Sequence, residues 1–283
     1  MLDVTLALTS SLCGGCADFG GGIQSRRRPL LTVLFVSQAT SLIIAVVVVV
    51  MSGHDAPAGR ALLLGLVGGV CHATALGCLY RGLAVGTMMV VAPIAALGAI
   101  VPVVVGLATG DDPAPLALVG ILLGLVGVAL ATRQRDGEGS NASGDKALRT
   151  GAVLALLAAL AFGGFYVAVS TAAEGDPLWA VLATRLSFVA AVSTCMLALR
   201  RRPQLTVDGA LPLMAVGALD VAAVGLFAFA TTTGLLSVTS VLASFPPLVV
   251  VLLAWFVLGE RLRADQLLGV LLTLAGVALI AAG

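Results

Sequence analysis

Charged residues are scarce in this chain: only 10% of its 283 residues are Asp, Glu, Lys or Arg, whereas 60% are hydrophobic. A soluble domain carries about 25% charged residues, so this chain cannot cover its surface with enough charge to stay in water. The composition therefore excludes a soluble globular domain and favours a protein that is solvated by lipid.

Cysteine, histidine and aromatic residues are also few. The five cysteines are an odd number and lie mostly in apolar runs, so no disulfide framework is predicted. Cys13 and Cys16 lie within one apolar run and the two histidines stand far apart, so we expect no metal site and no cofactor. The short arginine clusters have no aromatic residues between them, which argues against a nucleic-acid partner.

Long apolar segments dominate what is present. A membrane-spanning helix needs about 20 mostly apolar residues. Ten segments approach or meet this length, at 3–23, 30–51, 61–80, 84–107, 115–132, 150–171, 177–199, 209–230, 235–257 and 264–282. The breaks between them, such as SRRRP and GDDPAP, hold the Gly, Pro and charged residues that are typical of turns. The sequence therefore predicts an all-α polytopic membrane protein, and its first apolar run is not expected to be a cleaved signal peptide.

Two of these segments are nearly the same. GILLGLVGVAL (Gly120–Leu130) and GVLLTLAGVAL (Gly269–Leu279) agree at eight of eleven positions and lie 149 residues apart. The same offset places Gly14 on Gly163. These matches predict an internal duplication of about half the chain.

One long polar stretch, RQRDGEGSNASGDKALR, separates the fifth and sixth apolar segments, and its Gly and Ser content is typical of a flexible linker. We therefore expect a first five-helix repeat at 1–132, a linker at 133–149 and a second five-helix repeat at 150–283. Because five is odd, the second copy must enter the membrane from the opposite side, so the two repeats are predicted to be inverted.

The positive charges predict the orientation. Short loops rich in Lys and Arg stay in the cytoplasm. Thirteen such residues follow the odd-numbered helices, and the other loops and both ends hold only Arg60. The thirteen are Arg26, Arg27, Arg28, Arg81, Arg133, Arg135, Lys146, Arg149, Arg200, Arg201, Arg202, Arg261 and Arg263. We expect a multi-pass protein of a bacterial-type plasma membrane, with both ends outside.

The last two segments carry a recognisable set of motifs. ASFPPLVVVLLAWFVLGERLRADQLLGVLLTLAGVAL has a mid-helix proline, a Gly-Glu-Arg turn, a glutamine and a glycine-rich last helix, at Pro246, 259–261, Gln266, Gly269 and Gly276. With these motifs, and with YRGLAVG, VVAPIAALGA and GGCADFGGG in the first half, the chain resembles the EamA-type family of the drug/metabolite transporter superfamily. Cys13 departs from the family, which often has tryptophan there, and GDD replaces the first-copy Gly-Glu-Arg turn.

The resemblance implies secondary transport, commonly export of metabolites, amino acids or drugs, and no enzyme activity. The partners expected are therefore a small-molecule substrate, the lipid bilayer and protons as a coupling ion. The protein is expected to be a monomer or a homodimer.

Five polar residues inside the predicted spans are candidates for the site, because charges within a bilayer usually face an interior or a watery cavity. Asp18 and Asp220 each carry a coupling proton or serve architecture, since carboxyl groups that lose water bind protons more readily. Arg185 binds an anionic group of the substrate through its planar fork or forms a standing salt bridge to an aspartate. His72 is a pH-responsive group or a packing residue, and Gln38 forms an interhelix hydrogen bond or touches substrate.

Prolines give a second indication of where the transport site lies. Pro93 and Pro102 are predicted to interrupt the fourth helix, and Pro246 and Pro247 the ninth, because proline frees a carbonyl inside a helix. Breaks in corresponding helices of two halves indicate a transporter site. Further candidates near these segments are Tyr80, Ser240 and Ser244. The small number of aromatic residues argues against a dedicated cage for quaternary ammonium compounds.

The leading hypothesis is a proton-coupled exporter that works by alternating access. The alternative from another class is an intramembrane aspartyl protease that uses Asp18 and Asp220, since two carboxyl groups in one site split their proton affinities and activate water. The segment GALD at Asp220 lacks the Gly-x-Gly-Asp turn that such a protease needs. A passive channel is a further alternative. The substrate itself is not predicted.

Overall fold

The computed structural model describes residues 1–57, 59–85, 95, 97–131, 142–203, 207–258 and 264–282. These residues are almost entirely helical and include no strand. Within them, five helices are long and apolar enough to cross a membrane: Leu30–Ser52, Gly59–Gly82, Val153–Ala173, Pro177–Ala198 and Gly209–Thr233. Shorter apolar helical stretches lie at Leu97–Thr109, Pro115–Gly127, Leu236–Val250 and Leu267–Gly276. The all-helical class that the apolar segments predict is therefore confirmed.

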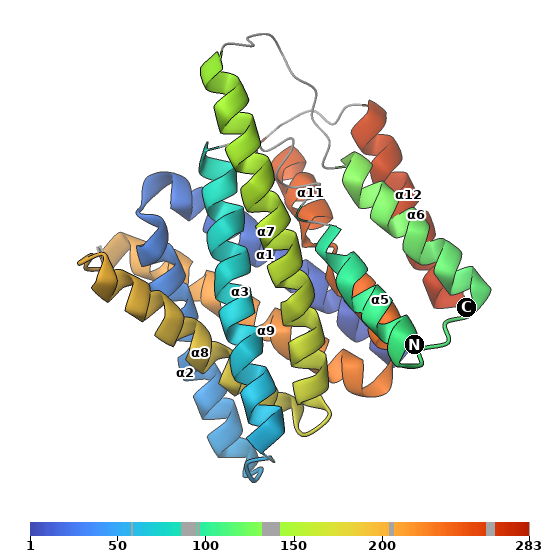
Figure 1. Ribbon diagram of the computed structural model, residues 1–283, viewed down its shortest axis with the longest axis horizontal. Helices are drawn as coiled ribbons and strands as arrows, with labels where there is room; N and C mark the ends of the chain where they lie inside the picture. Colours follow the sequence, from blue (N-terminus) through green and yellow to red (C-terminus); the bar gives the residue numbers. More distant parts are fainter. Residues whose placement is uncertain are drawn as a thin grey trace.

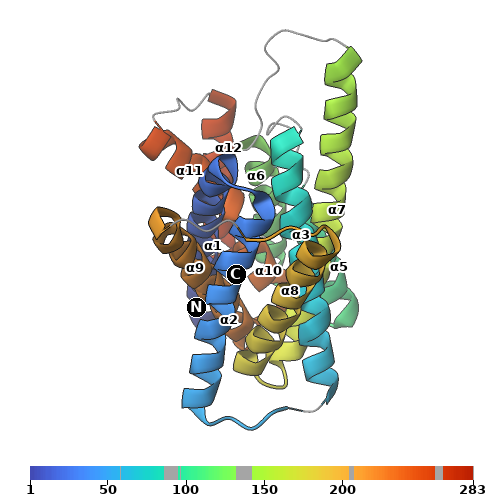
Figure 2. The same cartoon turned by 90° about the vertical axis from the view of Figure 1, so that its left-hand side faces the viewer.

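The helices follow the predicted segments closely (Figure 1). In the first half they are α1 (Leu2–Arg27), α2 (Leu30–Ser52), α3 (Gly59–Val85), the 3-10 turn η1 (Leu97–Ala99), α5 (Ile100–Thr109) and α6 (Pro115–Ala131). In the second half they are α7 (Ala142–Ala173), α8 (Pro177–Ala198), α9 (Val207–Thr233), α10 (Leu236–Ala243), α11 (Pro246–Leu258) and α12 (Ala264–Ala282). Helix α7 begins inside the stretch assigned to the linker, and it projects beyond its neighbours in both ribbon views (Figure 2).

The outer faces of the helices are apolar and the interior holds polar groups. Large exposed side chains such as Ile43, Val50, Leu122 and Leu160 are spread over different helices. Buried polar residues, among them Gln38, lie inside. This distribution is opposite to that of a soluble protein and fits a multi-pass membrane protein, whose outer surface meets lipid.

The packing of the helices pairs elements of the two halves. α1 packs on α9, and α3 packs on α7. α2 packs on both α8 and α9, and α3 packs on α8. α5 contacts α10, and α6 lies along α12, as Figure 1 shows at its right-hand side. Each helix of the first half therefore has its main partners in the second half.

Glycines let α6 and α12 approach closely. A Cβ atom added at Gly127 would lie 2.8 Å from the carbonyl oxygen of Gly269, and one added at Gly276 would lie 2.6 Å from that of Gly120. The partner number falls as the α6 number rises, so the two helices run antiparallel. Small residues are what allow such backbone contact in membrane helices.

The ninth predicted segment is two helices. α10 ends at Ala243 and α11 begins at Pro246, so the predicted interruption at this proline is confirmed. Pro102 does not interrupt a helix, because it lies in the first turn of α5, where its missing N–H has no carbonyl to bond. In the first half the 3-10 turn η1 leads directly into α5, and Pro93 lies outside the described residues.

Carboxylates fix two helix starts, one from the N-cap position of the helix itself and one from another segment. Asp176 caps α8 by accepting the N–H of Trp179 at 3.0 Å, and it also contacts Nδ1 of His54 at 2.6 Å. Asp111 accepts the N–H of Ser237 at 2.7 Å, in the first turn of α10. Such caps satisfy amide groups that a helix start leaves unbonded.

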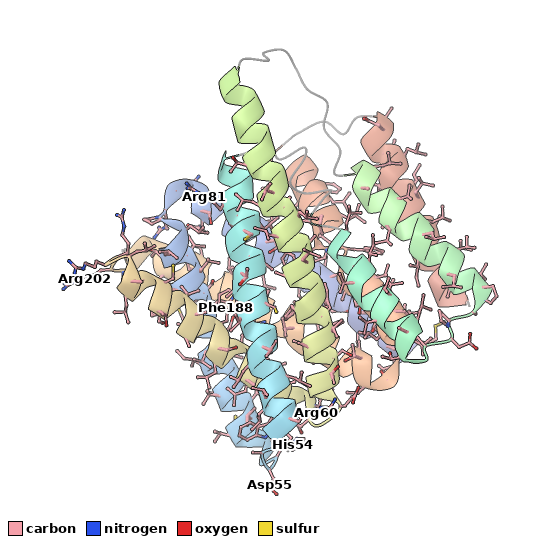
Figure 3. The ribbon with its side chains drawn as sticks, viewed as in Figure 1. His54, Asp55, Arg60, Arg81, Phe188 and Arg202 are labelled. Carbon is pink, nitrogen blue, oxygen red and sulfur yellow. The ribbon has the colours of Figure 1, made fainter. Side chains whose placement is uncertain are left out.

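Charged residues gather at the ends of the helices. Arg81 lies toward the upper left and Arg202 at the left edge in Figure 3, whereas His54, Asp55 and Arg60 lie toward the bottom. Both chain ends lie low in the view of Figure 1. The arrangement separates the arginine-rich loops from the loop that contains Arg60.

Candidate functional site

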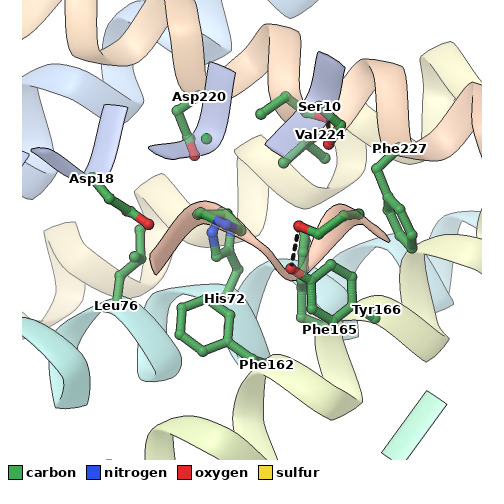
Figure 4. A pocket seen from close by; sticks show the side chains of 14 residues that line it. Ser10, Asp18, His72, Leu76, Phe162, Phe165, Tyr166, Asp220, Val224 and Phe227 are labelled. Atoms are coloured by element: carbon green, nitrogen blue, oxygen red, sulfur yellow. Dashed lines mark hydrogen bonds between the residues drawn. The ribbon is translucent and has the colours of Figure 1, made fainter. Parts of the chain in front are cut away.

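A pocket lies between the two halves of the chain (Figure 4). Its wall comes from α1, α3, α7 and α9 and from the break between α10 and α11, and its cavity volume is about 50 Å³. Its mostly apolar wall with a few polar groups is typical of small-molecule sites, although such sites commonly have a larger volume of about 300–1,000 Å³. The polar side chains in this wall are those of Ser10, Asp18, His72, Tyr166 and Asp220.

A buried charge cluster stands behind one end of the pocket. Nη1 of Arg185 donates to Oδ2 of Asp220 at 2.6 Å and to Oε1 of Gln38 at 2.6 Å, and Nε2 of Gln38 donates to the same Oδ2 at 2.7 Å. Arg185 is 0% exposed, and its Nε has no partner among the described residues. The three residues come from α8, α9 and α2, so the cluster joins three helices that are far apart in sequence.

His72 lies between this cluster and an aromatic wall. Its Nδ1 lies 3.5 Å from Nη1 of Arg185, and a guanidinium only donates, so Nδ1 accepts and the ring proton is on Nε2. The ring stacks on Phe165 at 4.3 Å between centroids and meets Phe188 edge-on at 5.3 Å. His72 is therefore held on one side by charge and on the other by aromatic packing.

Asp18 has a sparser environment. It is half-buried in α1, and its Oδ1 lies 3.4 Å from the hydroxyl of Tyr80 on α3, a long hydrogen bond. Within the described part of the chain, no salt bridge is formed by Asp18. Gly21, one turn further along α1, leaves the room that the Tyr80 hydroxyl occupies, since a Cβ atom there would lie 2.6 Å from it. The carboxyl group of Asp18 is thus left facing the pocket.

The helix break forms the remaining wall, and its free carbonyls have partners. Pro246 and Pro247 lack the N–H groups that would bond the carbonyl oxygens of Leu242 and Ala243. The hydroxyl of Ser11 on α1 donates to the first of these oxygens at 2.8 Å and also accepts the N–H of Phe245 at 3.0 Å.

Tyr166 on α7 supplies the second partner. Its hydroxyl donates to the carbonyl oxygen of Ala243 at 3.1 Å, a contact drawn in Figure 4. Helices α1 and α7 therefore stabilise the broken helix from two sides, and Tyr166 connects the break to the pocket wall.

The structure brings most of the predicted site residues together. Asp18, His72, Asp220 and Pro246 line the pocket. Gln38, Tyr80 and Arg185 stand behind its wall as hydrogen-bond partners of those residues. Of the two roles left open for Arg185, the structure shows the salt bridge, with Asp220 as its partner. Gln38 makes the expected interhelix hydrogen bonds.

Two predicted residues point elsewhere. Ser240 and Ser244 are buried, but their hydroxyls bond the carbonyl oxygens of Leu236 and Val241 within their own segment. Sequence reasoning missed Ser10 and Ser11, although a pair of hydroxyl residues in an apolar run is a usable signal. It also did not connect Tyr166 with the helix break.

Comparison with known proteins gives a family and a fold. Residues 149–282 match the model of the EamA-like transporter family. A solved crystal structure, whose title names no activity, superimposes with a TM-score of 0.77 at 17% identity over 98% of this chain and 95% of that one. At this identity the likeness shows the fold alone. No curated protein matches the chain.

Proposed function

We propose that this chain, whose residues 149–282 match the model of the EamA-like transporter family of the drug/metabolite transporter superfamily, is a secondary transporter that exports small metabolites, amino acids or drug-like compounds by alternating access. The observation that carries the proposal is the pocket between the two halves, which is lined by a carboxyl group and by a broken helix. Transporter sites are commonly built from discontinuous helices at the interface of two repeats.

The packing supports an inverted duplication. At the offset of 149 residues, α1, α3, α6 and α9 correspond to α7, α9, α12 and α3. The contact of α1 with α9 then becomes the contact of α7 with α3, and both are present. Likewise, the contact between Gly127 and Gly269 becomes that between Gly276 and Gly120, and both are close. Such reciprocal contacts are those of a two-fold relation, and the antiparallel course of α6 and α12 fits opposite orientations of the two halves.

The break between α10 and α11 supports a hinge that moves during transport. Its two free carbonyls are held by the hydroxyls of Ser11 and Tyr166 rather than by amide groups of the same helix. The segment can therefore bend there while losing few backbone hydrogen bonds, as hinges in transport require.

Asp18 is the better candidate for a coupling proton. A proton carrier must gain and lose its charge during the cycle, and a fixed positive neighbour would hold the charge in place. Asp220 has such a neighbour in Arg185 at 2.6 Å, whereas Asp18 has Tyr80. In this proposal Asp18 binds a proton when the pocket opens to one side and releases it on the other.

The protease alternative is weakened by the same geometry. Two catalytic aspartates must share a proton and a water molecule. Oδ2 of Asp220 already accepts hydrogen bonds from Arg185 and Gln38. A passive channel has no use for a carboxyl group that changes its charge, and transport by a channel would not depend on Asp18.

The test uses the purified protein in liposomes under an imposed pH gradient, with a mixed panel of amino acids, amines and organic acids. Wild type is expected to accumulate a member of the panel against its gradient. Asp18→Asn is expected to lose accumulation and to keep exchange of the same compound at saturating concentration, while Asp55→Asn, in an exposed loop, behaves as wild type. If the Asp18 variant accumulated as much substrate as wild type, Asp18 would not carry the coupling proton. Proteolysis without transport would favour the intramembrane protease.

A further inference from the structure

The pocket has a charged end and an aromatic end. Asp18 lies at one side in Figure 4, Tyr166 and Phe227 lie at the other, and His72 lies between them. Phe162 and Phe165 also line the pocket. Four of the thirteen aromatic residues of the chain thus gather at one site, so the low overall count is a poor guide to this pocket.

The charges in the wall leave a negative excess. Arg185 is paired with Asp220 and is 0% exposed, so this pair contributes no net charge and its cation is out of reach. Asp18 has no such counterion among the described residues. A cation that reaches Asp18 would therefore meet the one lining carboxylate without a fixed opposite charge.

The hydroxyl groups in the wall offer lone pairs and no hydrogens. The Ser10 hydroxyl donates to the carbonyl oxygen of Ala223 at 2.7 Å, and the Tyr166 hydroxyl donates to that of Ala243 at 3.1 Å. Each hydroxyl has one hydrogen, so both oxygens can only accept from a bound molecule. Asp18 accepts as well, and Nε2–H of His72 is the remaining donor among the lining side chains.

From these features we infer that the pocket binds a primary or secondary amine that carries an aromatic or bulky apolar body. The cavity of about 50 Å³ widens when the amine enters; the ammonium N–H groups then bond Asp18 and the neighbouring acceptors, and the body packs among Phe162, Phe165, Tyr166 and Phe227. A quaternary ammonium compound fills the same space but has no N–H to donate, so it binds more weakly. The inference rests on the proposed transport function and narrows its substrate class.

The test measures binding directly, by isothermal titration calorimetry on the full chain in detergent, without a gradient. Three probes share one body: 2-phenylethylamine, its N,N,N-trimethyl derivative and 3-phenylpropionate. The amine is expected to bind at least about tenfold more tightly than either of the others, since charge-assisted hydrogen bonds are stronger than neutral contacts and a tenfold change corresponds to one such bond.

Two variants locate the bound amine. Asp18→Asn is expected to lower amine affinity about tenfold or more and not to weaken 3-phenylpropionate binding, because it removes a negative charge from the wall. Ser10→Ala, which removes an acceptor and no charge, is expected to lower it by a smaller factor. Gel filtration and the cooperative unfolding of each variant show whether it is folded. Equal or tighter binding of the acid, or an amine affinity unchanged in the Asp18 variant, would overturn the inference.

The liposome panel separates the two proposals. If organic acids or neutral compounds accumulate and amines have no effect, the proposed transport function stands and the inferred amine site is rejected. Tight amine binding that depends on Asp18, together with no movement of any compound across the membrane, would reject the transporter and retain the binding site.

Discussion

Two aspartates line the same pocket, and their surroundings differ. Asp220 accepts short hydrogen bonds from Arg185 and Gln38, and its charge is matched by a guanidinium that is 0% exposed. Asp18 has Tyr80 at 3.4 Å. The comparison teaches that position in a pocket does not assign a role to a carboxyl group. A carboxylate with fixed partners keeps its charge in place and cannot be removed alone without cost, whereas one without them is free to exchange partners during a cycle.

The largest expected effect comes from Asp220→Ala. Removing one member of a buried ion pair leaves the other charge uncompensated, which costs about 3–5 kcal/mol of unfolding free energy. Unfolding of the purified protein in mixed micelles, titrated with a denaturing detergent, measures the loss. The double variant Arg185→Met with Asp220→Leu is the control, because it removes both charges and is expected to lie near wild type. A loss below about 1 kcal/mol for Asp220→Ala would mean that the pair does not hold the three helices.

A smaller effect is expected for Gln38→Leu. The side chain both donates to Asp220 and accepts from Arg185, and its loss leaves the ion pair intact but less well hydrogen-bonded, at about 1–3 kcal/mol. The same micelle titration measures it. Thr40→Val is a matched control on α2, because the Thr40 hydroxyl bonds only a carbonyl of its own turn. If the two variants were equally stable, Gln38 would add nothing to the cluster.

These expectations were open to sequence reasoning only in part. Long apolar runs fixed the positions of the helices, because lipid demands about 20 apolar residues for each span. Pro246 likewise predicted the break between α10 and α11, because its missing N–H removes a hydrogen bond within its own helix. Helix α7 starts at Ala142, inside the stretch predicted to be a linker, because nothing local prevents this polar stretch from being helical.

The partners inside the site were beyond such reasoning. Arg185 had two aspartates to choose from, and only the packing of α8 against α9 selects Asp220. Ser11 and Tyr166 acquire their role from carbonyls freed far away in sequence, at residues 242 and 243. The residues next to Ser11 and Tyr166 in the chain do not predict which carbonyl groups their hydroxyls will bond.

Tyr80→Phe tests how firmly Asp18 is held by its hydrogen bond. The bond from its hydroxyl to Asp18 is longer than the usual range for O–H···O, so its loss is expected to cost no more than about 0.5 kcal/mol. The ring stays in place and keeps its packing. A cost of 2 kcal/mol or more would show that Asp18 is held as firmly as Asp220 and that the two sites do not differ in kind.

Asp18→Asn is expected to have the smallest effect on stability. The amide has nearly the same size as the carboxyl group, it removes a charge that has no fixed counterion, and an uncharged polar group is easier to place in an apolar wall. Its unfolding free energy is therefore expected to lie within about 0.5 kcal/mol of wild type, the range seen for substitutions that break no network.

The same variant is expected to abolish gradient-driven accumulation in liposomes, so its stability and its activity separate. Asp220→Ala is expected to lose both together, because the pocket wall fails with the ion pair. Asp18→Asn could instead unfold at a much lower concentration of the denaturing detergent than wild type. Its loss of activity would then say nothing about proton transfer, and Asp18 would be counted with the structural residues. A stable variant that has lost only its response to the pH gradient is the outcome that assigns the two carboxyl groups different tasks.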